Sequence, residues 1–129
     1  MTADCPFCRL DVSKQLFSND LAIVIDDGFP VSRGHCLIIP KRHFSSLFEA
    51  TGGEQLALWE LVKQARQHLL SKYEPDGFNI GINDGIAAGQ TVMHLHIHLI
   101  PRYLGDTVDP RGGVRWIKPD KAPYWKNDG

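Results

Sequence analysis

Three histidines that alternate with apolar residues restrict the possible folds of this chain more than any other feature. His94, His96 and His98 are separated by Leu95 and Ile97. Because successive side chains of a β-strand point to opposite faces, the alternation predicts a strand with one apolar face and one face of imidazoles. Alternate residues lie about 6.6 to 6.8 Å apart on a strand, so three imidazoles span about 13 Å and cannot all bind one metal ion.

A row of imidazoles on one face of a sheet favours chemistry over plain solvation. Groups that titrate near neutral pH are costly to place side by side, and they are useful in catalysis. A solvated polar face remains the alternative, as it is for any single histidine. The spacing therefore favours a strand that catalyses a reaction or binds a ligand.

The rest of the pattern predicts one α+β domain with a mainly antiparallel sheet. The chain has 129 residues, which is enough for one core without a disulfide framework. A helix is predicted to begin at the capping box of Thr51 and Glu54 and to end before Pro75. Strands are predicted over residues 21–25, 35–39, 78–83 and 93–100.

The charge balance argues against nucleic acid and membranes as partners. Fourteen Lys and Arg residues oppose fifteen Asp and Glu residues, which gives a formal net charge of -1. No apolar run approaches the length of a membrane span, and the amino terminus lacks the features of a signal peptide. We therefore expect a cytoplasmic protein.

Two of the three cysteines have the spacing of half a zinc site. Cys5 and Cys8 form a C-x2-C pair, which needs two further ligands to complete a tetrahedral site. A redox pair or two unligated thiols are the alternatives, although a redox C-x2-C usually opens a helix after a strand. Cys36 lies inside an apolar run and is predicted to be buried. His68, on the charged side of the predicted helix, is expected to be solvated.

The segment His-Leu-His-Ile-His-Leu-Ile at residues 94–100 resembles the signature of the histidine triad family. Further similarity occurs at residues 21–27, 33–35, 40–43 and 89–91. The resemblance implies a five-stranded, mainly antiparallel sheet packed with one long and one short helix. It also implies a single domain over residues 1–129. Its core would be residues 1–102, and residues 103–129 would form an aromatic, Gly- and Pro-rich extension containing Trp116, Tyr124 and Trp125.

The resemblance implies a nucleotide hydrolase or transferase that works by covalent catalysis. In the family the middle histidine, here His96, attacks the α-phosphorus, and water cleaves the nucleotidyl-histidine. A backbone carbonyl of the same strand is expected to fix the tautomer of His96. His98 and His35 are expected to face the transferring phosphate and stabilise its charge.

The resemblance also implies a nucleotide-binding set around these histidines. Gln90, Thr91 and Asn83 are expected near the phosphates, although Gln90 and Thr91 could be polar residues at a strand edge. Asp27 is expected to hold the ribose hydroxyls, with turn chemistry beside Gly28 as the alternative. The expected walls of the base site are Ile25 and Phe7.

Bacterial members of the family, and the related galactose-1-phosphate uridylyltransferases, hold zinc with a C-x2-C pair and two histidines. This similarity implies Cys5, Cys8, His43 and His94 as ligands here. Four protein ligands leave no open position, so the zinc would be structural.

The residues after the triad resemble the fragile-histidine-triad branch of dinucleoside polyphosphate hydrolases. Pro101-Arg102 and Gly105-Asp106 carry this similarity, whereas the phosphoramidase branch usually continues with a glycine pair. The zinc pair is absent from eukaryotic members of the fragile-histidine-triad branch, so this chain mixes features. We expect cleavage of substrates such as diadenosine tri- or tetraphosphate. The alternatives are a nucleoside phosphoramidase and a nucleotide-binding module with little turnover.

Two further expectations concern the partner and the tail. Relatives are homodimers, so the resemblance implies a homodimer. The run Asp-Pro-Arg-Gly-Gly at residues 109–113 is either a loop near the phosphates or a surface turn.

Overall fold

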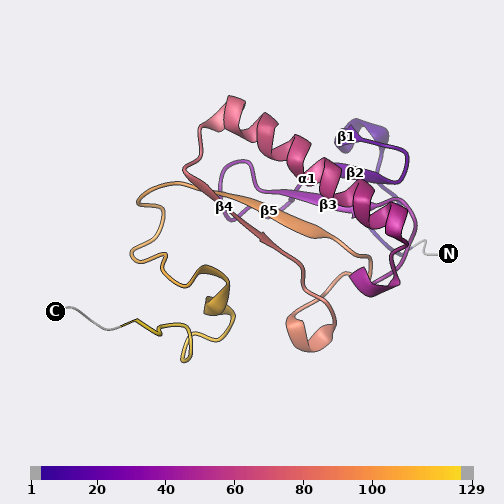
Figure 1. Ribbon diagram of the computed structural model, residues 1–129. Helices are drawn as coiled ribbons and strands as arrows, with labels where there is room; N and C mark the ends of the chain where they lie inside the picture. Colours follow the sequence, from indigo (N-terminus) through magenta and orange to yellow (C-terminus); the bar gives the residue numbers. More distant parts are fainter. Residues whose placement is uncertain (1–3, 126–129) are drawn as a thin grey trace.

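A long helix lies across one face of a five-stranded antiparallel sheet (Figure 1). This computed structural model describes residues 4–125. The strand order is β1-β2-β3-β5-β4, which places β1 and β4 at the two edges. The elements are β1 (Gln15–Ser18), β2 (Ala22–Asp26), β3 (Cys36–Pro40), α1 (Gly52–Tyr73), β4 (Gly77–Gly81) and β5 (Ile97–Arg102). The predicted α+β class is confirmed. In place of a short α-helix, the described residues contain 3-10 helices of three to five residues.

Helix α1 begins and ends where the sequence predicts. The Thr51 side chain accepts the Glu54 N–H, and the Glu54 carboxylate accepts the Thr51 N–H. Glu74 takes a left-handed conformation with φ 56°, and Pro75 follows, so the helix ends at Tyr73. One stripe of α1 is buried against the sheet and comprises Leu58, Leu61, Val62, Ala65 and Leu69.

The strand bounds differ from the prediction in ways that affect the histidines. β5 begins at Ile97 rather than at residue 93, because the chain before it bends: the Leu95 N–H donates to the Phe44 carbonyl at 2.7 Å. His94 and His96 therefore precede the strand, and only His98 lies within it. Pro101 does not end the strand, which continues through Arg102.

Two other strands also depart from the expectation. β4 occupies Gly77–Gly81 rather than residues 78–83. β1 is not predicted from the local sequence, because the strand has only four residues and these alternate between half-buried and exposed.

The second face of the sheet is only partly covered. Ile23, Ile25, Leu37 and Ile39 form a small core on which Phe7 and Leu10 of the amino-terminal segment pack. Toward β4 and β5, the same sheet borders a cavity lined by His35 and His98. The fold thus leaves an open area beside the histidines.

Two single-residue expectations have different outcomes. Cys36 is buried in the core, as predicted, and burial raises the pKa of its thiol to about 12. His68 is not simply solvated, because it is half-buried and packs edge-on against Phe17 with ring centroids 5.0 Å apart. No helix in residues 4–125 is long and apolar enough to cross a membrane.

The carboxylate of Glu54 joins the start of α1 to the loop after β3. Arg42 donates to it twice, from Nε at 2.9 Å and from Nη2 at 2.7 Å. These hydrogen bonds lower the pKa of Glu54 from 4.5 to about 2. Because the folded pKa lies below the unfolded one, the stabilisation is complete above pH 4.5 and is lost as the pH falls toward 2.

Replacing Glu54 with glutamine is expected to lower the free energy of unfolding at pH 7 by about 2 kcal/mol, the size of a lost hydrogen bond between charged groups. Urea unfolding between pH 7 and pH 2 measures this difference, which should shrink below pH 4.5. Glu60→Gln, at an exposed position of the same helix, is the control. A difference that does not depend on pH would contradict this account.

Candidate functional site

Two sulfur atoms and two nitrogen atoms converge between the amino-terminal segment and the start of the histidine run. The ligand atoms of Cys5, Cys8, His43 and His94 all lie within 4.8 Å of one another. His94 Nδ1 is 3.4 Å from the Cys5 sulfur and 3.5 Å from the Cys8 sulfur. His43 Nδ1 is 3.3 Å from the Cys8 sulfur and 3.1 Å from His94 Nδ1.

These residues fit a tetrahedral zinc ion. Zinc bonds of about 2.3 Å to sulfur and about 2.0 to 2.1 Å to nitrogen place neighbouring ligand atoms roughly 3.3 to 3.8 Å apart. The fully buried His94 donates from Nε2 to the Pro40 carbonyl at 2.7 Å, which leaves the Nδ1 lone pair facing the thiols. Such a hydrogen bond from the second ring nitrogen is typical of a metal-bound histidine.

The ring of His96 is fixed in one tautomer. Its Nδ1 lies 2.8 Å from the His94 carbonyl oxygen, which can only accept, so Nδ1 carries the proton. The acceptor is a backbone carbonyl, as the family resemblance implied, but it belongs to the residues that precede β5 and not to the strand. Nε2 is left with its lone pair, the form in which an imidazole attacks an electrophile.

A chain of hydrogen bonds also fixes His35 and His98. The Val31 N–H donates to His35 Nδ1 at 3.1 Å, so the proton of His35 is on Nε2. That N–H faces His98 Nδ1 at 2.9 Å, which places the proton of His98 on its own Nε2. Burial lowers the pKa of both rings, and for His98 the neighbouring His96 and His35 lower it further. His98 is therefore a neutral N–H donor.

Asp27 touches this histidine pair. One carboxylate oxygen lies 3.2 Å from His35 Nε2 and 3.8 Å from His98 Nδ1. The other accepts the Phe29 N–H at 2.8 Å, as in an Asx turn. Asp27 thus makes the turn contact expected beside Gly28, and its second carboxylate oxygen lies against the histidine pair.

Four further residues that the sequence predicts for the site lie in three different surroundings. Phe7 packs its ring edge-on to His96, with centroids 5.2 Å apart, above a small core that includes Ile25. Asn83 lines the cavity beside His35 and His98. Thr91 is exposed and lies by the metal centre rather than in that cavity.

Gln90 is buried within the loop that precedes the histidine run. Its side-chain oxygen accepts the Gly85 N–H, and its NH₂ group donates to the carbonyls of Ser45 and Val92. Both amide hydrogens are therefore used, one within the loop and one at the Ser45 carbonyl of the segment that follows β3. In this structure Gln90 holds the loop in place.

Two residues that line the cavity beside His98 are not among the site residues predicted from the sequence. The cavity has a volume of about 530 Å³, and its lining includes Asn79 and Arg102. Arg102 could have been found from the period of two, because His98 and Arg102 are four residues apart on β5 and share a face. Asn79 accepts from Arg102 Nη1 at 2.6 Å, across the β4–β5 pair. Its place depends on strand pairing that the local sequence does not show.

Fold and site together define the class of protein: an α+β domain with an imidazole-based site and an adjoining Cys2His2 centre. Residues 11–105 match the HIT domain. The chain therefore belongs to the HIT family, which confirms the resemblance to the histidine triad signature.

Two relatives that are named for an activity match this chain over only part of their own length. The adenylylsulfatase HINT3 of Arabidopsis thaliana is 37% identical over 77% of this chain and 52% of its own. The asymmetrical bis(5'-nucleosyl)-tetraphosphatase of Schizosaccharomyces pombe is 36% identical over 78% of this chain and 56% of its own. The chain thus spans about half the length of these two relatives.

A solved structure with a similar fold contains zinc. It is a zinc-bound histidine triad family protein from Mycobacterium smegmatis, 31% identical with a TM-score of 0.76. The match covers 84% of this chain and 82% of that one.

Proposed function

We propose that this protein hydrolyses nucleotides through a nucleotidyl intermediate on His96. One observation carries the proposal: the hydrogen bond from His96 Nδ1 to the His94 carbonyl leaves the lone pair of the neutral ring on Nε2, and this ring packs on His98, which lines the cavity, with ring centroids 5.2 Å apart. Relatives named as an adenylylsulfatase and a tetraphosphatase agree with a hydrolase.

In the first step, His96 Nε2 forms a bond to the α-phosphorus, and the bond from phosphorus to the leaving oxygen breaks. The leaving group departs as an anion, while His98 Nε2–H donates to a phosphoryl oxygen and stabilises the developing charge. In the second step, water attacks phosphorus, the P–N bond breaks and a proton goes to solvent. The His94 carbonyl stabilises the positive ring of His96 between the two steps.

For the substrate, we propose a dinucleoside polyphosphate of the diadenosine tri- or tetraphosphate type. The residues after the triad and the tetraphosphatase relative support this choice. Asn83 is proposed to contact the phosphates, with Gln90 placing its loop, whereas Thr91 lies outside the His98 cavity and is assigned no role. Asp27 is proposed to bind the ribose, and Ile25 and Phe7 the base.

The proposed substrate class is tested by comparing two substrates that differ in their leaving group. The protein is incubated separately with diadenosine tetraphosphate and with adenosine 5'-phosphoramidate, and AMP release is measured by chromatography. We expect a higher kcat/KM for diadenosine tetraphosphate. AMP release from the phosphoramidate alone would instead identify a phosphoramidase, and tight AMP binding without turnover would identify a binding module.

The hydrogen bond between His35 and His98 gives a prediction about catalysis. His98→Ala removes the donor to the phosphoryl oxygen and should lower kcat about 100-fold. His35→Ala should lower kcat about tenfold, since His35 acts by holding the tautomer of His98. Steady-state kinetics of the double variant check this dependence, because its kcat should equal that of His98→Ala. Additive losses would show that the two histidines act separately.

We further propose that the protein is cytoplasmic and that it holds a structural zinc ion. Cys5, Cys8, His43 and His94 would hold it, and it would tie the amino-terminal segment to the sheet. Phe7 lies between the two cysteines and packs on His96, so the zinc would also fix this contact.

A homodimer is the proposed assembly. β4 is an edge strand, and Ile80 on it is 45% exposed, so its free side offers backbone groups and apolar surface to a second copy. Sedimentation equilibrium should give the mass of two chains. A single-chain mass at micromolar concentration would contradict the proposal.

A further inference from the structure

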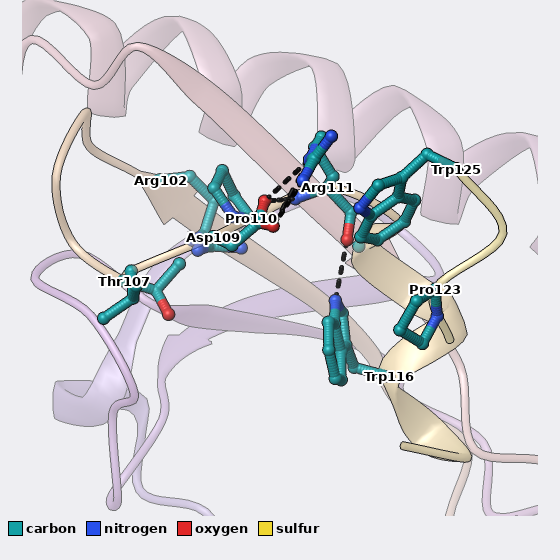
Figure 2. Close-up of a pocket in the computed structure, with 10 residues that line it drawn as sticks. Arg102, Thr107, Asp109, Pro110, Arg111, Trp116, Pro123 and Trp125 are labelled. Atoms are coloured by element: carbon teal, nitrogen blue, oxygen red, sulfur yellow. Dashed lines mark hydrogen bonds and ion pairs between the residues drawn. The ribbon is translucent and has the colours of Figure 1, made fainter. Parts of the chain in front are cut away.

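The carboxy-terminal segment forms a cavity that the proposed reaction does not use. Figure 2 shows its side chains, which include Arg102, Thr107, Asp109, Arg111, Trp116 and Trp125. The cavity has a volume of about 680 Å³. Most of its wall lies after residue 105, beyond the matched HIT domain.

This cavity borders the one that His98 lines. The two share Arg102, Thr107 and Gly113 as lining residues. His98 and Arg102 lie on the same face of β5, about 13 Å apart at the rise of a strand. A ligand whose reacting phosphate contacts His98 can therefore extend past Arg102 into the second cavity.

The second cavity offers aromatic surface rather than net charge. Trp116 is 41% exposed, and its indole N–H donates to the Arg111 carbonyl at 2.7 Å, which holds the ring in place. The Arg111 guanidinium lies 4.5 Å from the centre of the Trp125 ring. Asp109 pairs with Arg111 at 2.9 Å.

Arg102, the second arginine of the cavity, is also paired with a carboxylate. Arg102 forms two hydrogen bonds of 2.8 Å with the carboxylate of Asp106. With both guanidinium groups paired, the cavity suits a flat heterocycle with polar edges better than a free anion. Base stacking on aromatic side chains is sequence-tolerant, and the paired Asp109 and Arg111 present an acceptor and donors to amino or hydroxyl groups.

We infer that this cavity binds the base and sugar of the nucleoside that leaves with the polyphosphate, with Trp116 as the stacking surface. The inference rests on the proposed function and makes it more specific, because it requires a substrate with a nucleoside at each end. It also assigns the run at residues 109–113 to substrate binding rather than to a plain surface turn.

Binding measurements on a non-cleaving background test this inference. Kd is measured by calorimetry for diadenosine tetraphosphate and for AMP in His96→Ala, with and without Trp116→Ala. The second substitution should weaken dinucleotide binding about tenfold more than AMP binding, as expected for one lost stack. Trp116→Phe, which keeps an aromatic face, should recover most of that difference.

Trp59→Ala is the matched control, because Trp59 is 43% exposed on α1 and lies outside the cavity. It should leave the ratio of the two Kd values unchanged. Equal weakening of both ligands by Trp116→Ala, or no weakening, would overturn the inference. The proposed hydrolysis has its own readout, AMP release by the protein with His96 and Trp116 intact, so the two can fail separately.

Discussion

His96→Ala is expected to lower kcat for diadenosine tetraphosphate by about 10⁴-fold or more, the scale seen when a covalent nucleophile is removed. The His94 carbonyl fixes the proton of the neutral His96 ring on Nδ1, and the ring packs on His98 with centroids 5.2 Å apart. Steady-state AMP release measures the loss. His68→Ala, a histidine packed on Phe17 away from the site, should keep full activity and is the control.

Chemical rescue separates a lost nucleophile from a damaged fold. His96→Gly leaves space for free imidazole, which can attack the α-phosphorus, accept the nucleotidyl group and return activity as its concentration rises. Activity of His96→Ala within tenfold of the unchanged protein would contradict the covalent role of His96.

Removal of zinc is expected to have the largest effect on stability. The ion would join Cys5 and Cys8 to two histidines near the sheet, and it would bind only the folded chain, so its binding free energy adds to the free energy of unfolding. We expect Cys5→Ser to lose the metal and to lower Tm by about 10 °C, which corresponds to about 3 kcal/mol for a domain of this size. Metal analysis and thermal unfolding measure the two effects.

Cys36→Ala is the control for a thiol lost elsewhere, because Cys36 is in the core and away from the four ligands. It should destabilise the fold but retain one zinc per chain. Zinc in full amount in Cys5→Ser, or no zinc in protein purified without chelator, would contradict the assignment.

The sequence predicts the elements whose signal is local. The capping box at Thr51, the apolar stripe and Pro75 together define α1, and the structure agrees at both ends. The triad alternation correctly indicates a strand with a buried apolar face. It does not reveal that the strand begins only at Ile97, because the bend before it depends on the hydrogen bond from Leu95 to Phe44 in the segment that follows β3.

The candidate site also contains some features that the sequence predicts and others that depend on distant partners. His43 and His94 reach the cysteines in the structure, and the resemblance had named all four residues. The contact of Asp27 with His35 and the hydrogen bond from the Gln90 amide to the Ser45 carbonyl are not visible in the sequence, since each depends on a partner from another segment. The cavity of the carboxy-terminal segment was missed for the same reason.

The stereochemical course at the α-phosphorus tests the central claim most directly. The substrate is a dinucleoside polyphosphate with a chiral α-thiophosphate, hydrolysed in ¹⁸O-labelled water. Two successive in-line displacements, first by His96 and then by water, predict overall retention of configuration in the nucleoside monophosphorothioate. Inversion would mean that water attacks phosphorus directly, and it would contradict a covalent intermediate on His96.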